Sequence, residues 1–309
     1  MKNPLKAAFA RALDRRFAEL SAQIDRQQAE LRDAVAVLAA QSAEQQGRVD
    51  GALRYLLSEE AENCRRVEAM RASPEYLAPY EDPEPLVSIC IPLIEERIDL
   101  FLERALPSAL AQSHKAIELL VVCDGFDPSS EARLQAVDDP RVRFGWVTQS
   151  VINPHQHRHW LSASTLLQIE ARRMSTGLWI TELDDDDALP ADAIELLLAN
   201  ARETRAEVVS GTIEQFAPDG SSTLIAGFPP GMLPAWSGLG ADWKARATSA
   251  ALVHSGLSSI ARQRTEDFFE IPGDLMLTIK LARAGVRFAA IEDVVYDYYP
   301  GTLWGDDQR

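Results

Sequence analysis

Four consecutive aspartates, Asp184 to Asp187, are the residues of this sequence best suited to do chemistry. They follow the apolar run Trp179–Leu183 and precede Ala-Leu-Pro and a new helical pattern. Adjacent carboxylates repel one another unless a cation or a helix N-terminus offsets their charge. Their oxygens are hard ligands that suit Mg²⁺ or Mn²⁺. The alternative is an acidic turn in which Asp187 or Asp192 caps the next helix, but a cap needs only one carboxylate.

Apolar strand-like runs alternate with helical patterns from Leu86 onward, and these elements must position the aspartates. Strands are predicted at Leu86–Ile91, Glu118–Val122, Val142–Val147, Trp179–Leu183, Val286–Ile291 and Val294–Tyr299, helices at Leu100–Ala111 and Leu161–Met174, and a β-hairpin at Thr212–Phe228. Such alternation is typical of an α/β fold whose largely parallel sheet is covered on both faces. Ligands of such sheets bind beyond the carboxyl ends of the strands. Asp124 and the four aspartates follow strands and therefore belong to that edge.

The composition excludes some classes of function. The formal net charge is -16 over 309 residues, which opposes general nucleic-acid binding because that requires cationic side chains. A cation held by carboxylates would reverse this field locally, so an anionic phosphate ligand remains compatible with the charge. The 3 cysteines lack metal-ligand spacing, and the sequence has no apolar run long enough to span a bilayer. We expect reduced thiols and a cytoplasmic protein.

Residues 1–72 have a helical pattern without strand signals. Phe17, Ile24, Leu31 and Leu38 recur every seven residues, as the apolar seam of a coiled coil does. A helix this long cannot bury such a seam by itself, so we expect a stalk that forms a homo-oligomer. The first sixteen residues are rich in Lys and Arg, and two interpretations of them stay open: contact with the anionic inner face of a membrane, or a solvated helix end.

A linker separates this stalk from the α/β region. Pro74, Pro79, Pro83 and Pro85 end the helical pattern, because proline cannot continue a helix. The predicted organisation is therefore a coiled-coil stalk at residues 1–72, a Pro-rich linker at 73–85 and a catalytic domain at 86–309.

Four segments, in order, resemble the family 2 glycosyltransferases. Val87-Ser-Ile-Cys-Ile-Pro92 is similar to the first strand of that family, and Ala105-Leu-Pro-Ser-Ala-Leu-Ala-Gln112 to the helix after it. Glu118-Leu-Leu-Val-Val-Cys-Asp-Gly125 is similar to its second strand and acidic turn, and residues 177–190 to the segment that carries its Asp-x-Asp metal motif. The resemblance covers residues 85–300. It implies a GT-A fold, which is the Rossmann-like mixed sheet of nucleotide-diphospho-sugar transferases.

The resemblance implies a role for each matching residue. Pro92 and Asp124 would line the nucleotide pocket, with Asp124 accepting a hydrogen bond from the base; a tight Asp-Gly turn is the alternative for Asp124. Asp184, with Asp185 beside it, would face the ribose and phosphates, and Asp186 would bind Mn²⁺ or Mg²⁺ directly. The donor would be a UDP- or GDP-linked sugar. The acceptor would be a saccharide, a lipid-linked molecule or a protein.

An inverting transferase also needs a general base that removes the proton of the acceptor hydroxyl. The family places this carboxylate in a Glu-Asp pair that opens a late helix, eleven residues before a glycine. Asp274 stands eleven residues before Gly285 and matches the base, whereas Gly273 occupies the place of the glutamate. The alternative is that Asp274 only caps its helix.

Other positions depart from the family pattern. Gln168 and Ile169 stand where the family often has an Asn and an Arg at the donor diphosphate, and Ile94-Glu-Glu-Arg97 replaces a Tyr-Asn-Arg type sequence. Together with Gly273, these departures motivate the alternative function: a catalytically weakened GT-A-like binding or scaffold protein, assembled through its coiled coil. A nucleotidyltransferase is a further alternative, but the residues after Pro92 do not form a Gly-rich phosphate loop.

Two stretches with histidine and tryptophan remain open. His155, His157 and His159 alternate, as in a transition-metal site on a strand, but their proline and polar neighbours favour a loop whose imidazoles bind phosphate or sugar. Trp236 and His254 lie where this fold usually builds its acceptor side. Aromatic faces suit sugar rings, although tryptophans in a Gly/Pro-containing loop also pack beneath it.

Overall fold

The computed structural model describes residues 58–125, 127–147, 165–225, 250–260 and 273–300, together with scattered positions between Arg16 and Asp50. The chain divides into two compact units, Met1–Ser58 and Glu59–Arg309. The described positions of the first unit are helical, and Leu31 and Leu38 are exposed there. The continuous helix and its coiled-coil pairing stay predictions. Among the described helices, none is both long and apolar enough to cross a membrane.

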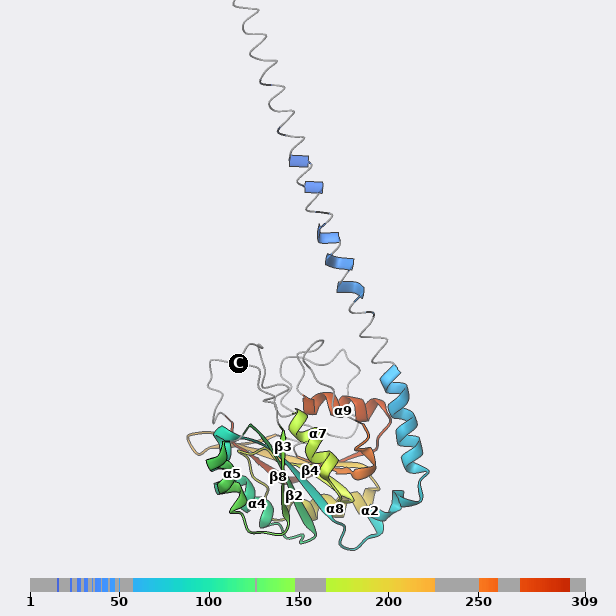
Figure 1. Ribbon diagram of the computed structural model, residues 1–309. Coiled ribbons are helices and arrows are strands. Elements are labelled where there is room, and N and C mark those ends of the chain that lie inside the picture. Colours follow the sequence, from blue (N-terminus) through green and yellow to red (C-terminus); the bar gives the residue numbers. More distant parts are fainter. Residues whose placement is uncertain are drawn as a thin grey trace, which may run out of the picture. The chain divides into compact units, whose positions relative to one another are not determined.

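The second unit is built on one mixed sheet (Figure 1). Its described strands are β1 (Val87–Ile94), β2 (Ile117–Asp124), β3 (Val142–Val147), β4 (Trp179–Glu182), β5 (Val208–Phe216), β6 (Ser222–Ile225), β7 (Ala251–His254) and β8 (Phe288–Tyr298). They lie in the order β3-β2-β1-β4-β7-β5-β6, with β8 beside β5. The predicted α/β class with a mixed sheet is confirmed.

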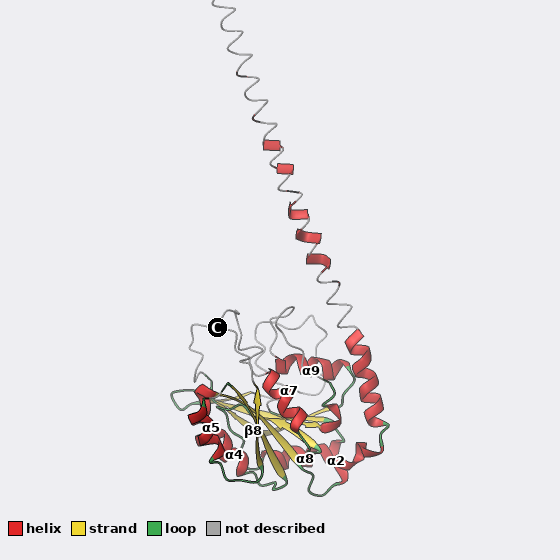
Figure 2. Ribbon diagram, viewed as in Figure 1, coloured by secondary structure: helices red, strands yellow, loops and turns green. Residues whose placement is uncertain are grey.

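Short helices and turns connect these strands. They are η1 (Pro74–Leu77), α2 (Ala78–Glu81), η2 (Glu95–Arg97), α3 (Ile98–Leu100), η3 (Phe101–Ala105), α4 (Leu106–Leu110), α5 (Pro128–Gln135), α7 (Thr165–Met174), α8 (Ala193–Thr204), η5 (Ser255–Leu257) and α9 (Gly273–Arg283). The predicted helix at Leu100–Ala111 is thus a series of three short helical segments. Helices lie on both faces of the sheet, with α7 on one and α8 on the other (Figure 2).

The first half of the sheet is parallel. β1 pairs in parallel with both β2 and β4, and β2 pairs in parallel with β3. The side chains of β1 and β2 are buried almost throughout, as expected for central parallel strands covered by helices. These four strands therefore end at one edge of the sheet, called here the carboxyl edge. Ile94 of β1 is the register partner of Asp124 of β2 there.

The second half corrects one prediction. Residues 286–299 were expected to form two strands, but β8 runs as one irregular strand parallel to β5. Its register shifts at Thr212, whose hydroxyl donates to the Glu292 carbonyl at 2.9 Å. The polar pair Glu292 and Asp293 therefore marks a bulge within the strand and not its end.

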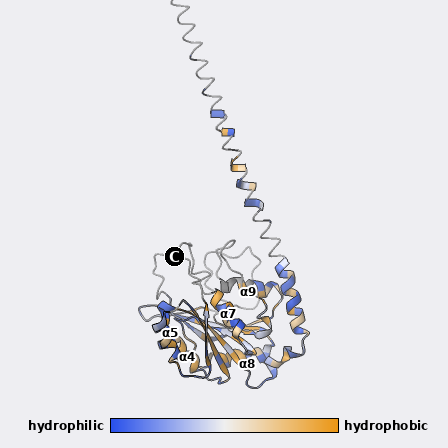
Figure 3. Cartoon of the chain, viewed as in Figure 1, coloured by the Kyte–Doolittle hydropathy of each residue, from blue (hydrophilic) through white to orange (hydrophobic). Residues whose placement is uncertain are grey.

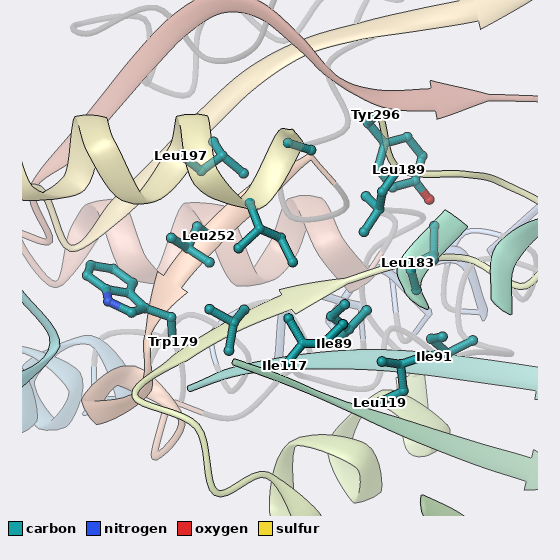
Figure 4. Packing of buried hydrophobic residues seen from close by; sticks show 14 of the residues in the cluster. Ile89, Ile91, Ile117, Leu119, Trp179, Leu183, Leu189, Leu197, Leu252 and Tyr296 are labelled. Carbon is teal, nitrogen blue, oxygen red and sulfur yellow. The ribbon is translucent and has the colours of Figure 1, made fainter. Parts of the chain in front are cut away.

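Two apolar layers hold the sheet between its helices. Ile89, Leu119 and Trp179 point to the face that packs against Leu197 of α8, as Figure 4 shows. Residues of alternate parity, such as Ile180, point to the α7 face. Burying a side chain of this size contributes roughly 1.5–3 kcal/mol. Figure 3 shows the resulting apolar strands at the centre of the unit.

The compact unit begins at Glu59, within the segment assigned to the stalk by its sequence. Residues 59–71 are helical, and Val67 is buried with Leu277 and Leu281 of α9. Arg71 donates two hydrogen bonds of 2.7 Å to the buried carboxylate of Glu207. The end of the long helical pattern is therefore part of the folded domain, because it covers apolar surface of α9.

Candidate active site

The four aspartates form a tight turn, the acidic turn, at the carboxyl edge after β4. The Asp187 N–H closes it by donating to the Asp184 carbonyl at 3.2 Å. Ala188 then exchanges two backbone hydrogen bonds, of 3.0 and 2.9 Å, with Asp297 of β8. The backbone is thereby fixed between two strands, which determines where each carboxylate can point.

Asp185 and Asp186 lie against the segment that follows β1. The Asp185 carboxylate accepts from the Ile94 N–H at 3.1 Å and from Arg97 Nη1 at 2.9 Å. The same Arg97 nitrogen lies 3.2 Å from Asp186 Oδ1. Arg104 donates to the backbone carbonyl of Asp186. Two arginines from the β1–α4 connection therefore contact the middle of the acidic turn.

Burial and neighbouring charges shift the pKa values of Asp185 and Arg97 in opposite directions. Burial raises the pKa of the Asp185 carboxyl to about 7, although Arg97 opposes the shift. Burial alone would lower the pKa of Arg97, but the charges of Asp185, Asp186 and Asp184 raise it above its ordinary value. Arg97 is therefore a firmly charged counter-ion within the site.

Asp187 has a structural role. Its carboxylate accepts from the Tyr296 hydroxyl at 2.9 Å and from the Tyr299 N–H at 2.8 Å. The Tyr296 oxygen in turn accepts from the Asp184 N–H at 3.0 Å. Asp187 thus ties the acidic turn to β8. The helix-cap interpretation is not supported, because Asp192, which precedes α8, makes no side-chain capping bond.

Tyr299 is held between a ring and a cation. Its ring stacks on Phe216 with centroids 4.9 Å apart and planes 10° apart. The Arg104 guanidinium lies over the Tyr299 ring, 3.9 Å from its centroid, and makes a cation–π contact with it. Arg104 is fixed by this stack while it binds the Asp186 carbonyl, so it braces the acidic turn.

Pro92 and Asp124 lie where the sequence placed them, on β1 and β2 near the carboxyl edge. Pro92 is buried inside β1, two residues before its end. Asp124 is the last residue of β2 and is 6% exposed. Gly125 follows with a φ of 67°, in the left-handed region that favours glycine. The chain therefore bends directly after Asp124, which lies at the same edge of the sheet as the acidic turn.

The structure corrects the acceptor-side assignment of His254. This residue pairs with Trp179, the first residue of β4, and so lies at the opposite edge of the sheet. It is 3% exposed, its Nδ1 accepts from the Gly256 N–H at 3.0 Å, and its Nε2 lies 3.1 Å from the Tyr76 carbonyl. Burial lowers the pKa of its imidazole to about 4. His254 is a neutral core residue.

Several predicted site residues lie wholly or partly outside the described residues. These are Trp236 and the three histidines His155, His157 and His159. Asp274 is the second residue of α9, so its backbone is described but its side chain is not. Its roles as general base or helix cap both stay predictions.

A buried polar pair lies beside the carboxyl edge on the α7 face. Arg172 of α7 donates to Glu182, the last residue of β4, at 2.9 Å, with side chains only 8% and 2% exposed. One turn earlier, Gln168 is 3% exposed and its Oε1 has no hydrogen-bond partner among the described residues. Arg172 thus pairs with Glu182 inside the protein, at a place other than positions 168 and 169, where the family pattern has its diphosphate contacts.

The acidic turn can supply part of the ligand set of a divalent cation. In the described residues, no three His, Cys, Asp or Glu side chains converge on one point. Asp187 is bound to β8, and Asp185 and Asp186 both contact Arg97. Asp184 and Asp186 stay the candidate oxygen ligands that the sequence predicts. Mg²⁺ is commonly held by one or two carboxylates, with substrate phosphates supplying further ligands. The donor set therefore fits a cation shared with a phosphate ligand.

Sequence reasoning missed the residues that organise this turn. Arg97 was noted only as a departure from the family pattern, and Arg104, Tyr296 and Tyr299 were not singled out. Arg97 and Arg104 follow the first strand in the sequence, and an acidic site at the same sheet edge attracts cationic side chains. This pair of arginines could have indicated the contacts.

Comparison with known proteins places this site within a recognised domain. Residues 88–226 match the family model described as "Glycosyl transferase family 2". The chain is 30% identical over 139 residues to the succinoglycan biosynthesis protein ExoO of Rhizobium meliloti (strain 1021), a match that covers 43% of this chain and 37% of that protein. The chain thus matches little more than a third of the length of this relative.

Solved structures show the same fold. TarS 1–349 of S. aureus has a TM-score of 0.52 and 14% identity, over 69% of this chain and 60% of that chain. TarS 1–349 in complex with UDP-GlcNAc has a TM-score of 0.51 and 14% identity, over 72% of this chain and 60% of that chain. The mixed sheet is therefore consistent with a GT-A fold.

Proposed function

We propose that the chain transfers a sugar from a nucleoside-diphosphate donor to an acceptor hydroxyl, because residues 88–226 match the family model "Glycosyl transferase family 2". The observation that carries the proposal is the acidic turn at the carboxyl edge of β4, inside the matched residues. Asp187 is bound to β8 and Asp185 to Ile94 and Arg97, and Asp184 and Asp186 are the carboxylates proposed to serve the donor. ExoO, named for succinoglycan biosynthesis, is a related protein whose name fits this class of reaction.

Asp186 is the proposed ligand of Mn²⁺ or Mg²⁺, with Asp184 facing the ribose and phosphates. A divalent cation bound there would neutralise the diphosphate that leaves the sugar. The protein's part is to hold the Asp186 backbone, which Arg104 does through its carbonyl and its stack on Tyr299. Divalent-metal dependence is typical of the family.

Pro92 and Asp124 are the proposed contacts of the nucleotide. Both lie on buried parallel strands, so their positions are set by the sheet and not by a loop. Asp124 would accept a hydrogen bond from the base. Asp185, predicted to bind the donor, instead pairs with Ile94 and Arg97, and its proposed role is therefore to position Arg97.

The proposed chemistry is inverting, with Asp274 as the general base for the acceptor hydroxyl. Support comes from its place in the first turn of α9, eleven residues before Gly285. No covalent intermediate is needed, because an activated hydroxyl attacks the anomeric carbon directly. Gly273 stands in place of the family's glutamate, so Asp274 would act without that neighbour.

The donor and the assembly complete the proposal. TarS is described in complexes with UDP and UDP-GlcNAc, which supports a UDP-linked donor, with GDP as the alternative base. The acceptor would be a saccharide, a lipid-linked molecule or a protein. The N-terminal helix would join copies of the chain in the cytoplasm. For its basic first residues, contact with the inner face of a membrane and a solvated helix end stay the two alternatives.

Titration calorimetry of UDP and of GDP with Mn²⁺ tests the metal assignment. We expect Asp186→Asn to abolish the Mn²⁺-dependent part of nucleotide binding while the fold stays intact. Asp192→Asn is the matched control, because Asp192 is exposed and makes no capping bond. Unchanged affinity in Asp186→Asn would reject Asp186 as a ligand. Absence of binding and of transfer in the native chain, across a broad panel of donors, would favour the scaffold function.

A further inference from the structure

Arg97 contacts two carboxylates of the acidic turn at once. Its Nη1 lies 2.9 Å from Asp185 Oδ1 and 3.2 Å from Asp186 Oδ1, so one nitrogen serves two carboxylates. We propose that Arg97 is a counter-ion that competes with the divalent cation for the Asp186 carboxylate. Arg97 releases this carboxylate when the donor diphosphate binds. This inference rests on the proposed function, because it takes Asp186 as the metal ligand.

The competition follows from geometry. Asp186 Oδ1 is the oxygen that Arg97 approaches, and a bound Mn²⁺ or Mg²⁺ would draw on the same carboxylate. Two cations on one carboxylate repel each other, and the low exposure of this group limits screening by solvent. The Arg97 side chain is 14% exposed and that of Asp186 is 10% exposed. Arg97 in this position therefore weakens the binding of a cation alone.

Arg97 is held in a way that permits its release. Of its guanidinium nitrogens, Nη1 makes the described contacts, whereas the buried Nε has no hydrogen-bond partner among the residues that the structure describes. A buried unsatisfied N–H costs free energy, and a phosphate group can accept from two guanidinium nitrogens at once. The donor diphosphate therefore offers Arg97 a better set of acceptors than the acidic turn does.

The two arginines of the site differ in this respect. Arg104 stacks on Tyr299 and donates to the backbone carbonyl of Asp186. Arg97 comes from η2, a turn of three residues, and contacts the carboxylates themselves. Arg104 is accordingly the fixed support, and Arg97 is the group that couples the two ligands.

Coupling of this kind has a thermodynamic signature. If the diphosphate removes Arg97 from Asp186, then UDP raises the affinity for Mn²⁺, and Mn²⁺ raises the affinity for UDP by the same factor. Removing the Arg97 charge should tighten binding of Mn²⁺ alone, on the order of 10-fold, and should reduce the effect of UDP on it by a similar factor.

The test is calorimetric titration of Mn²⁺ into the full chain, with and without UDP. The variants are Arg97→Gln, the double variant Arg97→Gln with Asp185→Asn, and the control Arg133→Gln. The double variant removes the Asp185 carboxylate together with its Arg97 partner, and so prevents Asp185 from becoming a new ligand. Arg133 pairs with Asp99, which is exposed, and its loss removes the same charge without touching the acidic turn. Circular dichroism and thermal unfolding report whether each variant folds.

We expect both Arg97 variants to bind Mn²⁺ alone more tightly than the native chain, and Arg133→Gln to match the native chain. Equal or weaker Mn²⁺ binding in the folded double variant would overturn the inference while leaving Asp186 as a ligand. If no protein binds Mn²⁺ even with UDP, the metal assignment itself fails and the inference falls with it.

Discussion

Lowering the pH should destabilise the domain through His254, although this residue lies far from the acidic turn. Its Nδ1 accepts from the Gly256 N–H, so the proton of the neutral ring resides on Nε2, which donates to the Tyr76 carbonyl. The rings of Tyr76, Tyr80 and Trp179 surround it, with centroids 5.4, 5.6 and 5.5 Å away. Protonation would place a second proton on Nδ1, break the bond from Gly256 and bury a charge among these rings.

The magnitude follows from the pKa of this imidazole. Burial lowers that pKa from its ordinary value of 6.5 to about 4, against a smaller opposing effect of Glu207. Between these values the unfolded chain binds a proton that the folded chain does not, so the free energy of unfolding falls as the pH falls. The full loss is roughly 3 kcal/mol, of which about 2 kcal/mol is reached at about pH 5.

Urea unfolding of the native chain and of His254→Gln, at about pH 7.5 and about pH 5, measures this contribution. We expect the variant to be less stable at the higher pH, because the Gly256 N–H loses its acceptor. Its further loss on acidification should be smaller than that of the native chain by about 2 kcal/mol. Other titrating groups are common to both proteins and cancel in the comparison. If the two proteins lose equal stability on acidification, burial does not keep His254 neutral.

Two further predictions concern catalysis and assembly. If Asp274 is the general base, Asp274→Asn should keep its affinity for Mn²⁺ and UDP, while single-turnover transfer at saturating donor falls about 10²–10⁴-fold; unchanged transfer would make Asp274 a helix cap. Removal of residues 1–58 should convert an oligomer into a monomer that keeps its thermal stability, measured by light scattering and calorimetry. A monomeric full-length chain would contradict the coiled coil and favour contact with a membrane.

The sheet could be predicted well because each strand carries its own signal. The strand predicted at Val142–Val147 has those bounds in the structure, and the central strands β1 and β2 differ from their predictions only at their ends. Continuous apolar runs are what strands buried on both faces require. The carboxyl edge followed from topology, because parallel strands end together.

The contacts within the site could not be predicted, because they join residues distant in the sequence. Arg97 and Asp185 are 88 positions apart, and Tyr296 and Asp187 are 109 positions apart. A local pattern carries no information on which arginine reaches which carboxylate. His254 was misplaced for a similar reason: its position in sequence gave no indication that β7 runs antiparallel to β4 and carries it to the opposite edge.

The structure also changes the reason for assigning a cation to the acidic turn. From the sequence, four adjacent carboxylates required some offset to their repulsion, and a metal ion was one candidate. In the folded domain, Arg97 pairs with Asp185 and Asp186, and the Tyr296 hydroxyl and the Tyr299 N–H bind Asp187. The protein therefore supplies its own offset, and stability of the turn no longer argues for a metal. What argues for one is the proposed diphosphate ligand, because its negative charge would have to be held beside Asp184 and Asp186 in a protein of net charge -16. The cation in this proposal consequently belongs to the substrate complex, and Arg97 is the residue that connects its binding to that of the donor.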